Sequence, residues 1–99
     1  MIVKNKQDVI KVLQTHRDKL KDFGVASLGL FGSFVRNAAN SESDIDLVVV
    51  FEASQKSFNN FMNLSFFLED LLQRKVDLVT IESLSPYIRE NILQEVEYV

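Results

Sequence analysis

The spacing of apolar residues alternates along the chain between a helical period and short continuous runs. Residues 6–23 place apolar side chains three to four positions apart on one stripe, which predicts an amphipathic helix that ends at Gly24. Similar patterns predict helices over 57–73 and 86–97, the latter with Ser85 as N-cap and Pro86 in its first turn. Apolar runs over 26–31, 44–51 and 76–81 predict three strands.

The order of these elements predicts an α/β fold. The run from Leu47 to Phe51 is unbroken, which is typical of a central strand covered on both faces. The simplest arrangement is a single domain over residues 1–99, with a three-stranded sheet packed against helices. The directions of the strands do not follow from the pattern.

The predicted helix over 57–73 is apolar around more of its surface than a small domain requires. A stripe of about 100° is sufficient for packing on a core, and Leu64, Phe67 and Leu71 extend beyond it. Two explanations stay open. A neighbouring helix could cover the surplus within the domain, or a partner protein could dock on it.

The bulk composition narrows the class of protein. Hydrophobic residues make up 46% and charged residues 25% of the 99 residues, as in ordinary globular proteins. No apolar run reaches the length of a membrane span, and the N-terminal residues lack the apolar core of a signal peptide. The absence of cysteine excludes disulfides and thiolate metal sites. We therefore expect a cytoplasmic protein without a membrane partner.

The charge pattern disfavours a nucleic-acid partner. The net charge is −3, and the eleven Lys and Arg residues are scattered rather than clustered, whereas proteins that hold nucleic acid by its backbone normally present a basic surface. His16 is the single histidine, so no histidine-based metal cluster can form. We expect it to pack at the edge of the first helix.

Candidate chemistry gathers at the start of the most apolar strand. Asp44 and Asp46 open this strand, and alternation of side chains puts both on one face, roughly 6.5 Å apart along the backbone. Two such carboxylates repel each other unless a cation lies between them, and hard oxygen ligands suit Mg²⁺ together with a substrate phosphate. The Gly32-Ser33 pair closes the preceding strand and can offer N–H groups and a hydroxyl to that phosphate.

A Gly-Ser pair, ten intervening residues and Asp-x-Asp form the signature of polymerase-beta-type nucleotidyltransferases. The short chain resembles the minimal nucleotidyltransferases, MNT domains that occur as antitoxins beside HEPN-domain toxins. The resemblance implies the mixed sheet of the nucleotidyltransferase palm, two Mg²⁺ ions, and ATP as substrate. It also implies that Asp77 supplies the third acidic position, so that Asp44, Asp46 and Asp77 are the catalytic residues and the metal ligands.

The same resemblance assigns nucleotide binding to Gly32, Ser33 and Arg36. Gly32 would let the backbone approach the phosphates closely, and Ser33 would hydrogen-bond a phosphate oxygen. Arg36 could stabilise the charge of the triphosphate or brace the loop by pairing with an acid. Asn37 stands where the family usually has glycine, and asparagine tolerates a positive φ better than most residues.

The resemblance implies Mg²⁺-dependent transfer of AMP from ATP to a hydroxyl, that of a tyrosine, on a HEPN RNase toxin, with this chain as the antitoxin. No substrate-binding domain is visible, so a partner or a homo-oligomer must present the acceptor. Two alternatives stay open. The chain could neutralise its toxin by binding, with weak catalysis or none, or it could act on a small molecule or an RNA end.

Overall fold

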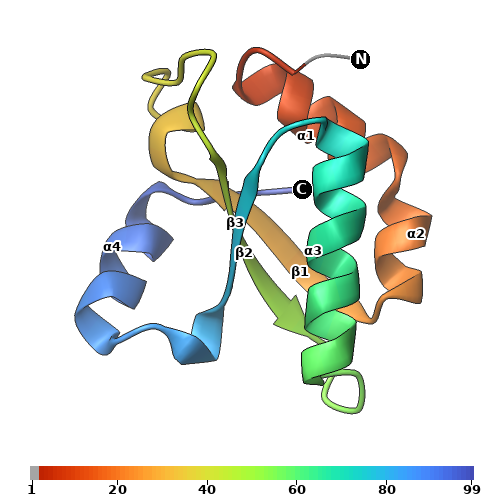
Figure 1. Cartoon of the computed structure of the whole chain (residues 1–99). Coiled ribbons are helices and arrows are strands. Elements are labelled where there is room, and N and C mark those ends of the chain that lie inside the picture. Colours follow the sequence, from red (N-terminus) through yellow and green to blue (C-terminus); the bar gives the residue numbers. More distant parts are fainter. Residues whose placement is uncertain (1–2) are drawn as a thin grey trace.

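The computed structural model describes residues 3–99 and shows helices on both sides of a mixed sheet (Figure 1). The predicted domain, residues 1–99, includes residues 1 and 2, which lie outside the described residues. The elements in chain order are α1 (Lys6–Thr15), α2 (Arg17–Asp22), β1 (Val25–Phe31), the 3₁₀ turn η1 (Gly32–Phe34), β2 (Ile45–Phe51), α3 (Phe58–Leu72), β3 (Val76–Thr80), the 3₁₀ turn η2 (Ile81–Ser83), α4 (Pro86–Glu95) and β4 (Glu97–Tyr98).

The sheet has four strands in the order β3-β2-β1-β4. Strand β1 runs antiparallel to both β2 and β4, whereas β2 and β3 are parallel and are joined by the crossover helix α3. The predicted α/β class and mixed sheet are confirmed, and β2 is central as expected. In Figure 1, α1, α2 and α3 gather on one side of the sheet and α4 lies on the other.

The prediction of three strands is wrong because the chain ends in a fourth. Strand β4 pairs Glu97 with Leu30 and Tyr98 with Gly29. Two residues are too few to show the alternation that marks a strand. In addition, Val96 continues the four-residue spacing of Ile88 and Ile92, so the pattern predicted that the last helix runs on to residue 97.

The predicted single helix over 6–23 is also wrong in one detail. The chain breaks at His16, whose φ of −106° and ψ of 24° separate α1 from α2. The His16 ring is half-buried, and its Nδ1 lies 2.9 Å from the carbonyl oxygen of Val12. Gly24 follows α2 with a φ of 80°, which confirms the predicted glycine stop.

The surplus apolar face of α3 is covered from within the protein. Leu64 is fully buried, and the Phe67 ring packs on Phe23 with 5.1 Å between ring centroids. Leu71 also packs against the core. A partner therefore has no access to Leu64, whereas Phe67 and Leu71 are only half-buried. Elsewhere on α3, Phe58 and Phe66 are 77% and 61% exposed.

None of the helices in residues 3–99 has the length and apolar character that crossing a bilayer requires.

Candidate active site

The strand register brings Asp46 and Asp77 together. Asp46 is the second residue of β2, and it pairs with Phe31 of β1 on one side and with Asp77 of β3 on the other. Paired positions on neighbouring strands carry their side chains on the same face, about 4.8 Å apart. Since Gly32 follows Phe31 directly, the predicted turn and two of the predicted acids meet at one end of the sheet.

Asp44 lies just outside the sheet. The prediction that the strand begins at Asp44 is wrong by one residue, because β2 begins at Ile45. Asp44 is exposed, but its charge is felt at Asp46. The three predicted acids therefore border a common region, with Asp46 at its centre and Asp44 and Asp77 at its solvent edge.

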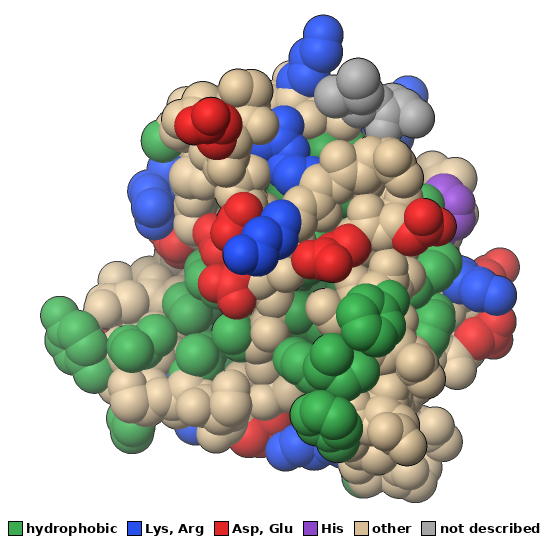
Figure 2. All heavy atoms as spheres, in the orientation of Figure 1, with side chains coloured by type: hydrophobic (Ala, Val, Ile, Leu, Met, Phe, Trp, Pro, Cys, Tyr) green, Lys and Arg blue, Asp and Glu red, His purple; other side chains and the backbone are tan. Residues whose placement is uncertain are grey.

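The electrostatics of Asp46 reveal an excess of negative charge. Burial, together with the negative charges of Asp77, Asp44 and Glu95, raises the pKa of Asp46 to about 6, against an opposing effect of Arg36. A carboxylate whose ionised form is this unfavourable gains from a cation beside it. Figure 2 shows acidic side chains gathered near the middle of one face, above a hydrophobic patch.

These acids fit a magnesium ion that arrives with its substrate better than a preformed metal cage. Within residues 3–99, no three His, Cys, Asp or Glu side chains converge closely enough to hold an ion. Mg²⁺ is commonly held by one or two carboxylates, several waters and the phosphate oxygens of a substrate. The pairing of Asp46 with Asp77 supplies such an incomplete, all-oxygen set.

Gly32 is required by its contact with Asp46. Its φ is 78°, and a Cβ at this position would overlap Oδ2 of Asp46. Any side chain would therefore push the turn away from the carboxylate. The predicted reason for glycine was close approach of a phosphate, and the structure adds this second reason from inside the protein.

The rest of the turn has the expected shape. Gly32 opens η1, and its carbonyl oxygen accepts a hydrogen bond of 3.2 Å from the Arg36 N–H. Ser33 is half-buried within the same turn. Asn37 has a φ of 57°, a left-handed conformation that asparagine adopts more readily than most residues.

Glu95, which the sequence pattern does not indicate, also belongs to this group of residues. Its Oε2 accepts a hydrogen bond of 2.8 Å from the Gly32 N–H, and its Oε1 lies 2.8 Å from Nη1 of Arg36. Of the two roles left open for Arg36, bracing the loop by pairing with an acid is therefore the one present in this structure. The available signal was an acid at the C-terminal end of a helix, where the helix dipole disfavours it.

Comparison with known proteins places this chain in a family. Residues 11–99 match the family model of the nucleotidyltransferase domain. The chain belongs to the nucleotidyltransferase domain family. The protein adenylyltransferase MntA of Thermococcus cleftensis is 40% identical to it over 94 residues, which cover 94% of each chain. The prediction of an enzyme of the nucleotidyltransferase family is thereby confirmed.

Solved structures agree with this family assignment. A structure of a candidate minimal nucleotidyltransferase matches with a TM-score of 0.82 and 29% identity, covering 94% of each chain. A toxin–antitoxin structure with AMP-PNP matches with a TM-score of 0.69 and 26% identity, covering 95% of this chain and 71% of the other. The complex of a tri-AMPylated Shewanella oneidensis HEPN toxin with its MNT antitoxin matches with a TM-score of 0.60 and 26% identity, covering 95% and 67%.

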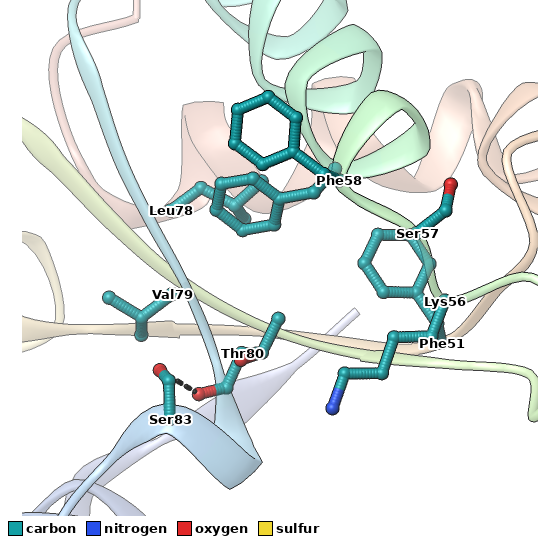
Figure 3. A pocket seen from close by; sticks show the side chains of 9 residues that line it. Phe51, Lys56, Ser57, Phe58, Leu78, Val79, Thr80 and Ser83 are labelled. Carbon is teal, nitrogen blue, oxygen red and sulfur yellow. Dashed lines mark hydrogen bonds between the residues drawn. The ribbon is translucent and has the colours of Figure 1, made fainter.

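A separate cavity of about 500 Å³ lies toward the other end of the sheet (Figure 3). It is bordered by Phe51, the last residue of β2, and by Phe58 at the start of α3. Thr80 of β3 closes one side, where its carbonyl oxygen accepts a hydrogen bond of 2.8 Å from the Ser83 hydroxyl (Figure 3). This cavity shares strand β3 with the acidic site but contains neither Asp46 nor Asp77.

Proposed function

We propose that this nucleotidyltransferase transfers AMP from ATP to a hydroxyl of a partner protein, and that the partner is a HEPN RNase toxin which the chain neutralises as an antitoxin. The observation that carries the chemistry is the register of Asp46 and Asp77 beside the Gly32 turn. The choice of substrate and partner is supported by relatives named as a protein adenylyltransferase, as a toxin–antitoxin with AMP-PNP, and as an antitoxin with a tri-AMPylated HEPN toxin.

The acidic residues would bind the metal ion, and the Gly32 turn would bind the phosphates of the nucleotide. Asp44, Asp46 and Asp77 would hold Mg²⁺, as one or two ions, in the all-oxygen surroundings described above. When bound, Mg²⁺ neutralises charge on the phosphate oxygens. The Gly32 N–H and the Ser33 hydroxyl would donate to phosphate oxygens, and the Arg36 guanidinium would add positive charge beside the triphosphate.

We assign to Asp77 the role of receiving the proton of the acceptor. It is exposed on β3, and β3 is an edge strand, so a hydroxyl on another protein can reach it. In the reaction the acceptor oxygen bonds to the α-phosphorus, the bond from that phosphorus to the bridging oxygen breaks, and pyrophosphate leaves. The hydroxyl proton passes to the Asp77 carboxylate, which acts as general base.

A tyrosine hydroxyl is the acceptor that we propose. The edge position of β3 suits an acceptor carried by a second protein, because no further strand pairs with that edge within residues 3–99. The cavity in Figure 3 continues along the same strand and gives a partner an apolar surface to contact.

Transfer of label from ATP labelled in the α-phosphate tests this function. Wild-type protein, Mg²⁺ and the product of a neighbouring HEPN gene should give one labelled band, and the label should map to a tyrosine of the partner. Asp46→Asn should give none, whereas Asp70→Asn, a change of the same kind on the exposed surface of α3, should label normally.

Absence of label in the wild-type reaction, with a stable complex between the two proteins, would refute the transferase. It would favour the alternative of an antitoxin that acts by binding alone. Label on RNA or on a small molecule, with none on protein, would refute the choice of acceptor.

A further inference from the structure

The Glu95 carboxylate occupies the two groups that the proposed function assigns to the triphosphate. One carboxylate oxygen accepts from the Gly32 N–H and the other contacts the Arg36 guanidinium, each at 2.8 Å. A backbone N–H and a guanidinium that converge on one negatively charged group form an anion site. In this structure the anion is supplied by the chain itself.

The surroundings of Glu95 make this contact more than a surface ion pair. Glu95 is the last residue of α4, where the helix dipole disfavours a negative charge. Asp46 is near enough that the two carboxylates repel each other, as the effect of Glu95 on the Asp46 pKa shows. Both the dipole of α4 and the Asp46 carboxylate disfavour the negative charge of Glu95 at this position. The Gly32 N–H and the Arg36 guanidinium are therefore the groups that hold the Glu95 carboxylate there.

We propose that Glu95 is an intramolecular occupant of the anion site at Gly32 and Arg36, and that a bound triphosphate displaces it. The inference rests on the proposed function in one respect, namely that this turn receives a triphosphate. A carboxylate and a phosphate group cannot share the same two donors, and their charges repel. Glu95 therefore lowers the affinity for nucleotide and keeps the turn in its bound shape when nucleotide is absent.

Displacement needs no rearrangement of the fold. The Glu95 side chain is 25% exposed and the Arg36 side chain 59% exposed, so their contact lies at the surface where a ligand can reach it. The backbone after Glu95 is fastened independently, because Glu97 pairs with Lys6 at 2.8 Å and β4 pairs with β1. Rotation of one glutamate side chain into solvent is sufficient.

Titration calorimetry with inorganic triphosphate in the presence of Mg²⁺ tests the proposal. Glu95→Gln should bind about tenfold more tightly than wild type, the scale of one hydrogen bond to a charged group. Glu97→Gln is the matched control, because it removes the same charge two residues away without touching the turn, and it should bind like wild type. Equal or weaker binding by Glu95→Gln would overturn the proposal, and weaker binding would make Glu95 a permanent brace of the loop.

A second readout follows the Gly32 amide directly. The chain has three glycines, so selective ¹⁵N-glycine labelling gives three amide signals. In wild type, saturation with Mg²⁺ and triphosphate should move the Gly32 signal and leave those of Gly24 and Gly29 in place. Glu95→Gln should move the same signal without ligand. A Gly32 signal that stays fixed in both experiments would also overturn the proposal.

Failure of this inference can be told apart from failure of the proposed function. Label transfer by wild type, together with unchanged triphosphate binding in Glu95→Gln, overturns the role of Glu95 alone. Tighter binding by Glu95→Gln in a protein that transfers no label supports the displaced carboxylate and refutes the transferase. If neither protein binds triphosphate, the turn is not an anion site for phosphates and the role of Glu95 fails, and the proposed function fails with it only if wild type also transfers no label.

Discussion

Asp46 and Asp77 are register partners in the parallel pair β2–β3, so two acidic side chains stand side by side on one face of the sheet. Neighbouring like charges at this spacing disfavour each other's ionised form. The pKa of Asp46 is raised to about 6, mainly by burial and then by the charge of Asp77. The fold thus holds a carboxylate in a position that is unfavourable for the metal-free protein.

Replacement of Asp46 or Asp77 by asparagine should lower the activity without lowering the stability of the fold. Asp46→Asn and Asp77→Asn should each reduce label transfer at least about 100-fold, the scale of a lost general base or metal ligand. Both variants should melt at or above the wild-type temperature without metal, because each removes a repelling charge. Initial rates and circular-dichroism melts measure the two effects, with Asp70→Asn as control. A variant with wild-type rates would exclude that residue from the reaction.

The contribution of Asp46 to the stability of the metal-free protein should fall as pH rises from about 4 to about 6. The ordinary pKa of aspartate is about 3.9, and folding raises that of Asp46 to about 6. Between these values the folded state holds more protons than the unfolded state, so stability is greatest below the unfolded pKa and is lost as pH passes the folded one.

The size of this loss should be modest, because Asp46 is only half-buried and solvent screens its charge. We expect about 1 kcal/mol. Urea unfolding at several pH values in EDTA measures it, and the difference in free energy of unfolding between wild type and Asp46→Asn isolates the contribution of this residue. Parallel curves for the two proteins between pH 4 and 7 would contradict the prediction.

Local patterns were sufficient to predict the central strand, the helices over α3 and α4 and the Gly24 stop, because each depends on residues close in sequence. They failed where distant segments decide the structure. Strand β4 exists because Gly29 leaves room beside β1, where a Cβ would overlap Val96. The contact of Glu95 with Gly32 joins residues that are 63 positions apart.

The surplus apolar face of α3 shows the same limit. The pattern alone allowed two explanations. In the structure part of the cover comes from within the protein, because Phe67 packs on Phe23, which lies on the chain segment that follows α2. The periodicity of apolar residues indicates which side chains will be buried, but not which segment of the chain packs on them.

Gly32→Ala should abolish the binding of Mg²⁺ and triphosphate and should also lower the stability of the fold. The positive φ costs about 1–3 kcal/mol for a residue with a side chain, and the added Cβ would overlap Asp46. Gly24→Ala is the matched control, because Gly24 has a φ of 80° and its Cβ would overlap Gln55, far from the acids. Both variants should lose thermal stability, but only Gly32→Ala should lose binding of Mg²⁺ and triphosphate in calorimetry. Normal binding by Gly32→Ala would show that the turn need not pack on Asp46.

Leu64→Ala should destabilise the protein, whereas Phe58→Ala should not. Leu64 projects from α3 into the core and is fully buried. Its truncation to alanine should therefore cost about 2–5 kcal/mol of stability, from lost burial and the cavity left behind. Phe58 is on the same helix but 77% exposed, and its removal should stay within about 0.5 kcal/mol. Urea unfolding, with the slope compared between variants, measures both. Equal midpoints for Leu64→Ala and wild type would mean that Leu64 is accessible after all, and would restore this face of α3 as a surface for a partner.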